Sequence, residues 1–170
     1  INDIPVLGIC FGHQFLANQL GGKVDYHWNK EQKKGTREVS IINNTIFKND
    51  RTFNLIYSHQ EGVVECPNDF NISASSEMVK IEGIKHKSKA IWGFQAHIEA
   101  SWSFAQRQGI SLNEYDPLKD STGLPLDPVS LEVYTYFLEL FLDKGLLLST
   151  SSTGWFMSLF DFGKTGKFPA

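Results

Sequence analysis

The sequence has little cysteine, no long apolar run and no surplus of positive charge, and each shortage excludes a class of protein. Its two cysteines are not spaced as Cys-x-x-Cys, which argues against a zinc site or a thioredoxin-type redox motif. A membrane-spanning helix needs about 18 consecutive apolar residues, and no such run occurs. Sixteen Lys and Arg against nineteen Asp and Glu give a net charge of −3. This balance does not favour nucleic-acid binding, which needs cations to neutralise phosphates.

The rest of the composition is that of an ordinary globular domain. The 170 residues are 41% hydrophobic and 21% charged, and a chain of this length buries a core without disulfide bonds. Few cysteines in a chain of this size are typical of a reducing compartment, so we predict a cytoplasmic protein. We expect no metal and no cofactor. The Ser/Thr-rich and then aromatic stretch over 149–170 predicts a tail that follows a domain at 1–148.

The chain opens with a pattern of strand, sharp turn and helix. Residues 4–9 form a short apolar run, as expected of a buried parallel strand. Apolar residues then recur at three- and four-residue intervals over 11–20, which predicts a helix that ends at Gly21-Gly22. Further strands are expected over 38–42, 53–57, 70–75, 79–84 and 90–95, a helix over 127–144, and polar loops over 30–37 and 57–63.

The strongest local signal is Gly8-Ile9-Cys10-Phe11-Gly12, which has the form Gly-x-nucleophile-x-Gly. A nucleophile on a tight strand-to-helix turn has little room around it, so small residues flank it. The N-terminus of the following helix presents N–H groups and a positive dipole end, which stabilise an anion. His13, on that helix, is expected to point away from the sulfur. On the pentapeptide alone, a structural cysteine in an ordinary turn stays an open alternative.

The second signal is Gln95-Ala96-His97-Ile98-Glu99, which follows an apolar strand. On extended backbone His97 and Glu99 lie on the same face, so the carboxylate can orient the imidazole. A surface strand end with two polar residues is the alternative. A third, weaker signal is the polar segment around Ser58-His59-Gln60, because polar segments at strand ends often line a site.

Together these segments resemble a class I glutamine amidotransferase domain. The residues that carry the resemblance are Pro5 to Gln14, Gly21-Gly22, Ser58-His59 and Gly93 to Glu99, in this order. The resemblance implies an α/β fold of the flavodoxin-like type, a mostly parallel open sheet with helices on both faces. The family normally has strands and a glycine-rich oxyanion loop before the nucleophile. We therefore expect this chain to be an N-terminally incomplete domain that lacks the first strands.

The resemblance also implies roles for the residues of the first two motifs. Cys10 would attack the side-chain amide of glutamine and form a γ-glutamyl thioester. His97 would move the proton and expel ammonia, and Glu99 would orient His97. The N–H of Phe11 would be one oxyanion donor, and Gln14 would help to hold the substrate.

The segment Ser58, His59 and Gln60 would contact the amino-acid end of the glutamine, and the ammonia would pass to a synthetase domain or subunit. Two alternatives stay open. A γ-glutamyl peptide or conjugate hydrolase of the same fold would use the same triad. A non-catalytic remnant that acts as a binding module would use none of it.

Overall fold

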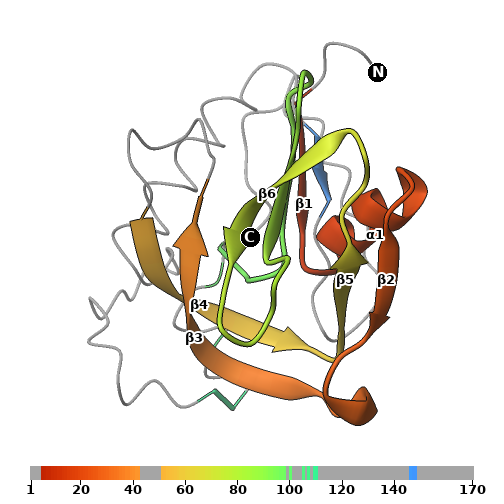
Figure 1. Cartoon of the computed structure of the whole chain (residues 1–170). Coiled ribbons are helices and arrows are strands. Elements are labelled where there is room, and N and C mark those ends of the chain that lie inside the picture. Colours follow the sequence, from red (N-terminus) through yellow and green to blue (C-terminus); the bar gives the residue numbers. More distant parts are fainter. Residues whose placement is uncertain are drawn as a thin grey trace.

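The computed structural model describes residues 5–42, 51–98, 100, 105, 107, 109–110 and 146–148, with Arg51 and 146–148 as backbone only. Its elements are β1 (Val6–Ile9), α1 (Phe11–Gln19), β2 (Lys23–Tyr26), the 3-10 turn η1 (Trp28–Lys30), β3 (Lys33–Ile41), β4 (Arg51–His59), β5 (Glu61–Glu65), β6 (Phe70–Ser75), β7 (Gly83–His86), β8 (Ile91–Phe94) and β9 (Leu146–Leu148) (Figure 1). One sheet has the order β4-β3-β6-β7-β8-β1-β9, and β2 and β5 form a second, two-stranded sheet. The helix expected over 127–144 and the tail over 149–170 lie outside the described residues.

The strand before the predicted nucleophile, β1, lies between β8 and β9. It runs parallel to both, with Ile9 beside Phe94 and Val6 beside Leu146. All four residues of β1 are buried, as the apolar run predicts, because a strand covered on both faces carries apolar side chains on both. The strand β9 was not predicted, since three residues are too few to show a periodic pattern.

The α/β fold class is confirmed, and within the described residues the large sheet is mixed rather than mostly parallel. The pairings of β1 with β8 and β9 are parallel. The pairings that join β4, β3, β6, β7 and β8 are antiparallel. The short connections from β6 to β7 and from β7 to β8 explain this, because a parallel pair needs a crossover of a dozen or more residues.

The pair β3 and β4 corrects one prediction. The two strands pair antiparallel from Lys33 beside His59 to Ile41 beside Arg51. The loop predicted over 30–37 is therefore wrong from Lys33 onwards. The strand predicted over 53–57 lies within β4, and the one predicted over 38–42 lies within β3 except for Ile42. Polar side chains gave this end of β3 the character of a loop. Hydrogen bonds to β4 pair the backbone N–H and C=O groups of this segment, so it forms a strand in spite of its polar side chains.

The polar loop predicted over 57–63 is also wrong. Within the segment only Gln60 stands between strands, because β4 ends at His59 and β5 begins at Glu61. Antiparallel pairing with β2, from Tyr26 beside Glu61 to Lys23 beside Glu65, makes the second half a strand. The strand predicted over 70–75 is confirmed as β6, whereas the one predicted over 79–84 begins only at Gly83.

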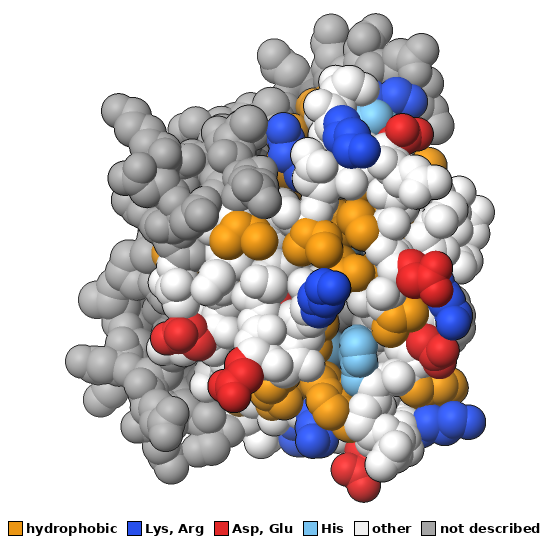
Figure 2. All heavy atoms as spheres, viewed as in Figure 1, with side chains coloured by type: hydrophobic (Ala, Val, Ile, Leu, Met, Phe, Trp, Pro, Cys, Tyr) orange, Lys and Arg blue, Asp and Glu red, His pale blue; other side chains and the backbone are white. Residues whose placement is uncertain are grey.

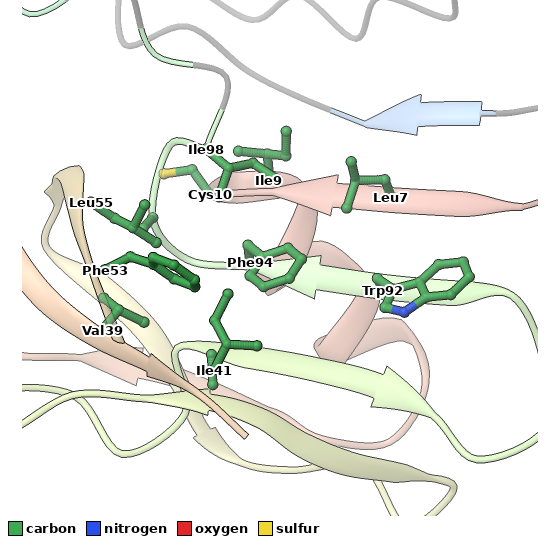
Figure 3. Close-up of a cluster of buried hydrophobic side chains, with 12 residues drawn as sticks. Leu7, Ile9, Cys10, Val39, Ile41, Phe53, Leu55, Trp92, Phe94 and Ile98 are labelled. Carbon is green, nitrogen blue, oxygen red and sulfur yellow. The ribbon is translucent and has the colours of Figure 1, made fainter. Parts of the chain in front are cut away.

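Two apolar contacts hold the region around the predicted nucleophile. The helix α1 contacts β1 and β8 of the large sheet on one side and β2 and β5 on the other (Figure 1). In the main core, Phe53 and Leu55 of β4 face Ile9 and Phe94 across the cluster (Figure 3). This packing fixes β3 and β4 against the ends of β1 and β8, where Cys10 follows.

Candidate active site

Cys10 is the one residue between β1 and α1, and its backbone is strained. Its φ of 52° and ψ of −106° are unusual for a residue with a side chain. A Cβ on Gly8 would lie 2.5 Å from the carbonyl oxygen of Gly12 and 2.7 Å from Cδ1 of Leu16. The turn is therefore tight enough to exclude a side chain at Gly8. This is the nucleophile-elbow geometry that the pentapeptide predicts.

The end of β8 lies beside this elbow. The N–H of Cys10 donates to the carbonyl oxygen of Phe94 at 2.8 Å, and Nε2 of Gln95 donates to Sγ of Cys10 at 3.7 Å. Since β1 and β8 are parallel neighbours, the residues after both strands meet at the same edge of the sheet. His97 belongs to this edge, because it follows β8 by three positions.

His97 is buried, with 3% of its surface exposed. Its N–H donates to the carbonyl oxygen of Ile56 at 2.8 Å, which ties the segment after β8 to β4. His97 also lies near enough to His59 to contribute to lowering the pKa of His59. The elbow, the segment with His97 and the end of β4 therefore meet at one place. Glu99, the predicted orienting carboxylate, lies outside the described residues.

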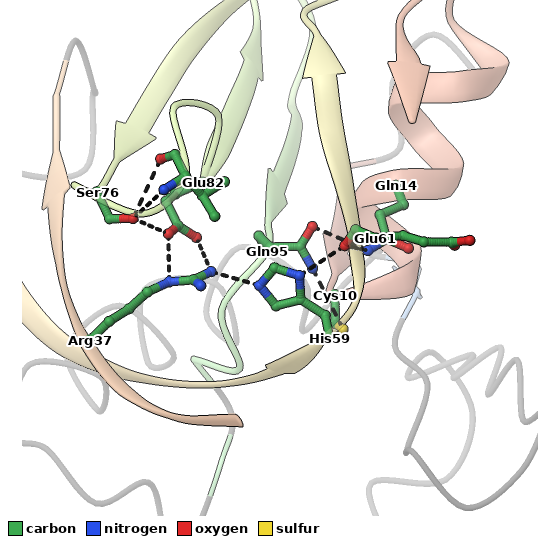
Figure 4. Close-up of polar contacts among 9 residues, drawn as sticks. Cys10, Gln14, Arg37, His59, Glu61, Ser76, Glu82 and Gln95 are labelled. Carbon is green, nitrogen blue, oxygen red and sulfur yellow. Dashed lines mark hydrogen bonds and ion pairs between the residues drawn. The ribbon is translucent and has the colours of Figure 1, made fainter. Parts of the chain in front are cut away.

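A chain of hydrogen bonds joins three of the predicted positions (Figure 4). Nε2 of Gln14 contacts the carbonyl oxygen of Glu61 at 2.6 Å and Oε1 of Gln95 at 3.2 Å. Nδ1 of His59 contacts the same Glu61 carbonyl at 2.8 Å. Together with the bond from Gln95 to Cys10, these contacts connect His59 and Gln14 to the sulfur.

The other predicted substrate contacts are placed differently from one another. Ser58 is buried and its Oγ accepts a hydrogen bond from Nε2 of Gln32 at 3.3 Å. Gln60 is exposed, and its carbonyl oxygen accepts the N–H of His27 at 2.8 Å. Phe11 is half-buried at the start of α1. The structure thus brings Gln14 and His59 into the network around Cys10 and leaves the Gln60 side chain outside it.

A hollow of about 290 Å³ opens between α1 and the β2–β5 ribbon. Its walls include Phe11 and Gln14 from α1 and Tyr26 and Glu61 from the ribbon. The hollow combines aromatic rings with a few polar groups, as small-molecule sites commonly do. It therefore offers room for a small ligand next to the residues that follow Cys10.

Charges of both signs share the face of the molecule that Figure 2 shows. On the face in Figure 2, basic and acidic side chains are interspersed around a broken band of hydrophobic ones. Among the described residues no cluster of three His, Cys, Asp or Glu side chains could hold a metal ion. No helix in the same part of the chain is long and apolar enough to cross a membrane.

His13 is a core residue. Its side chain is fully buried, and a Cβ on Gly93 would lie 2.5 Å from its Nδ1. Burial lowers the pKa of His13 to about 4, and the nearby backbone of Ile81 opposes this only in part. The ring is therefore neutral at pH 7 and packs against the strand that leads to His97.

Sequence reasoning missed Gln95, Arg37 and Glu82. Gln95 is fully buried and contacts both Cys10 and Gln14. Its position two residues before His97 on an extended segment could have indicated a shared face. Arg37 and Glu82 form a buried ion pair behind His59. No motif could have joined them, because they lie 45 positions apart.

The sequence model of the family described as "Glutamine amidotransferase class-I" matches residues 1–112. The chain belongs to this family. The curated relatives of this amidotransferase chain include a GMP synthase (glutamine-hydrolyzing) subunit of Methanocaldococcus jannaschii, 39% identical over 99 residues, which cover 58% of this chain and 52% of that protein. GMP synthase (glutamine-hydrolyzing) of Lactobacillus acidophilus is 36% identical over 97 residues, covering 56% of this chain and 19% of that protein. The chain thus spans about half the length of the methanogen relative.

Solved structures agree on the amidotransferase fold. A putative GMP synthase subunit from Thermoplasma acidophilum has a TM-score of 0.59 at 22% identity, covering 81% of this chain and 57% of that one. A glutamine amidotransferase from Thermotoga maritima has a TM-score of 0.52 at 25% identity, covering 79% of this chain and 56% of that one.

Proposed function

We propose that this chain is the glutamine-hydrolysing part of an amidotransferase and that Cys10, His97 and Glu99 form its catalytic triad. The observation that carries the proposal is the strained elbow at Cys10, which stands at the carboxyl end of β1 beside the strand that leads to His97. Strain of this kind is concentrated at functional sites. Membership of the amidotransferase family supports glutamine as the substrate.

In the first half-reaction the Sγ of Cys10 attacks the side-chain amide carbon of glutamine. The C=O electron pair moves to oxygen, and His97 carries the thiol proton to the leaving nitrogen. The C–N bond then breaks, ammonia departs and a γ-glutamyl thioester stays on Cys10. In the second half-reaction His97 deprotonates a water, whose oxygen attacks the thioester. Glutamate departs and the proton returns to the sulfur.

The helix α1 would stabilise the oxyanion that forms in both half-reactions. The first N–H groups of a helix have no acceptor within it and point out of its N-terminus, where the dipole is positive. The N–H of Phe11 stands at this end of α1, directly after the nucleophile. Glu99 would hold His97 in its productive orientation and stabilise the imidazolium.

The hollow beside α1 would bind the body of the glutamine substrate. Gln14 stands in its wall and His59 in the network behind it. Ser58 and Gln60 flank His59 and would contribute mainly backbone groups. The ammonia would pass to a synthetase domain or subunit. Since several relatives carry the name GMP synthase (glutamine-hydrolyzing), we extend the proposal to the synthetase that makes GMP.

The test is glutamine hydrolysis by the 170-residue chain, measured as glutamate and ammonia released. We expect turnover in the wild type, none in Cys10→Ala, and covalent labelling of Cys10 by a glutamine-like chloroketone. Gln19→Ala, a change at the exposed end of α1 outside the hollow, is the control for folding. Preferential cleavage of γ-glutamyl dipeptides would favour the hydrolase alternative. A folded wild type that is neither active nor labelled would contradict the proposal.

A further inference from the structure

A buried ion pair lies behind the network and has no part in the proposed reaction. Arg37 of β3 is 6% exposed and Glu82, just before β7, is 1% exposed. Nε of Arg37 lies 2.6 Å from Oε1 of Glu82, and Nη2 lies 2.7 Å from Oε2. Oγ of Ser76 donates to Oε1 of Glu82 at 2.5 Å. Removing two charges from water costs several kcal/mol per ion. The ion pair is therefore a weak source of stability.

The ion pair determines which nitrogen of His59 carries the proton. Nη2 of Arg37 lies 2.8 Å from Nε2 of His59. Arginine has donors and no acceptor, so Nε2 of His59 must accept. The neutral ring then carries its hydrogen on Nδ1 and donates it to the carbonyl oxygen of Glu61 at 2.8 Å. Burial first, and the charge of Arg37 next, lower the pKa of His59 to about 3, so the ring is neutral at pH 7.

The same carbonyl then fixes the amide of Gln14. Nε2 of Gln14 donates to the carbonyl of Glu61 at 2.6 Å and to Oε1 of Gln95 at 3.2 Å. With both amide hydrogens used, the remaining polar atom of Gln14 is its acceptor, Oε1. Gln14 lines the hollow next to α1, and a ligand there would meet an acceptor and not a donor.

We propose that Arg37 and Glu82 are positioning residues for the substrate site: they hold His59 as the Nδ1–H tautomer, and His59 and Gln14 share the Glu61 carbonyl so that Gln14 presents Oε1 to an N–H group of glutamine. The identification of that ligand as glutamine rests on the proposed function. If Arg37 were lost, His59 could carry its proton on Nε2. Its Nδ1 would then be an acceptor facing the Glu61 carbonyl at 2.8 Å. The repulsion between these two acceptors would displace the carbonyl that holds Gln14.

The kinetic test compares variants of the residues that link Arg37 to Gln14 through hydrogen bonds. Arg37→Met combined with Glu82→Gln removes the pair without leaving a buried charge unpaired. We expect its KM for glutamine to rise about tenfold while kcat changes less than about threefold, because the pair acts on binding and not on Cys10. His59→Asn keeps a donor near the Nδ1 position and should raise KM less than His59→Phe. Lys85→Met, which removes a charge from β7, is the control and should leave both constants unchanged.

A second readout needs no activity. In the ¹⁵N-histidine NMR spectrum of the 170-residue chain, His59, assigned by its loss in His59→Asn, should show a protonated Nδ1 and a bare Nε2 from pH 5 to 8. In the double variant the two tautomers should mix, and the titration should move up towards pH 6.5. Besides Arg37, the titratable side chains of the described residues that lower the pKa of His59 include His27 before η1 and His97 after β8.

The two readouts separate failure of the inference from failure of the proposed function. A wild-type His59 protonated on Nε2, or a double variant with an unchanged tautomer, would overturn the inference whether or not glutamine is hydrolysed. A tenfold loss of kcat with unchanged KM in the double variant would also overturn the inference. If the wild type does not hydrolyse glutamine, the proposed function fails, and the nitrogen spectrum still decides the role of Arg37.

Discussion

Gln95 donates a hydrogen bond from Nε2 to Sγ of Cys10, at 3.7 Å. The contact is buried, and the other end of the same amide accepts from Gln14 at 3.2 Å. The donor is therefore held facing the sulfur, where it would stabilise a developing thiolate in the proposed reaction. Hydrogen bonds to charged groups contribute about 1.5–3 kcal/mol.

Gln95→Glu should therefore slow both alkylation of Cys10 by iodoacetamide at pH 7 and glutamine turnover, each by about tenfold or more. The substitution keeps the size of the side chain and turns the donor into an acceptor that repels a thiolate. The matched control is Gln19→Glu, at the exposed end of α1, which should alter neither rate. An alkylation rate equal to that of the wild type would show that the contact does not act on the sulfur.

Gly8→Ala should destabilise the fold by about 1–3 kcal/mol, because its Cβ would meet the backbone of Gly12 at 2.5 Å. Backbone atoms cannot move aside without opening the turn, so the reactivity of Cys10 should change as well. Urea denaturation measures the first effect and thiol titration the second. Gly21→Ala is the comparison, since nothing lies within 4 Å of a Cβ there and only its φ of +92° opposes the change. Gly21→Ala should destabilise the fold by about 1 kcal/mol and leave the reactivity of the Cys10 thiol unchanged.

Acid should destabilise the protein through His13. Its pKa is about 4 in the fold and 6.5 when unfolded, so the unfolded chain binds the extra proton. The free energy of unfolding therefore falls as the pH drops from 6.5 towards 4, by on the order of 3 kcal/mol for this group. His59 acts in the same direction, whereas Glu82, whose pKa burial raises, acts in the opposite one.

His13→Gln isolates the contribution of His13. Plots of unfolding free energy against pH, obtained from urea denaturation, should be clearly shallower between pH 6.5 and 4 in the variant than in the wild type. Parallel curves would mean that His13 titrates normally in the fold and is not buried as described.

The contact between Gly93 and His13 should appear in a double-mutant cycle. Gly93→Ala places a Cβ 2.5 Å from Nδ1 of His13, and His13→Ala removes the ring and leaves a cavity. Each single change should destabilise by about 1–3 kcal/mol. In the double variant the methyl group occupies part of the space that the ring left. Its loss should be smaller than the sum of the single losses by about 1 kcal/mol, and strict additivity would contradict the packing.

The sequence predicted the structure correctly where the local chemistry and the packing of a segment require the same residue types. Gly8 and Cys10 were predictable because a tight strand-to-helix turn needs a small residue before a strained nucleophile, and both requirements are local. The burial of β1 was predictable because a strand covered on both faces leaves a continuous apolar run.

Long-range pairing was not predictable. Lys33 and Lys34 are polar residues of a strand only because β4 pairs with them. Glu61 belongs to a strand only because β2 does the same. The ion pair of Arg37 and Glu82 depends on two strands whose proximity no single segment encodes. The predicted roles of Cys10, His97, Glu99 and the substrate contacts stay predictions until the assays above are made.

The pairing of Val6 with Leu146 has a consequence for how the protein comes into being. The two residues lie 140 positions apart and their strands are parallel neighbours. A contact of such high sequence separation forms only after a large loss of chain entropy. During synthesis one edge of β1 therefore stays unpaired until the residues of β9 have left the ribosome. Cys10 follows β1 directly, so the surroundings of this nucleophile are completed only after β9 has been made.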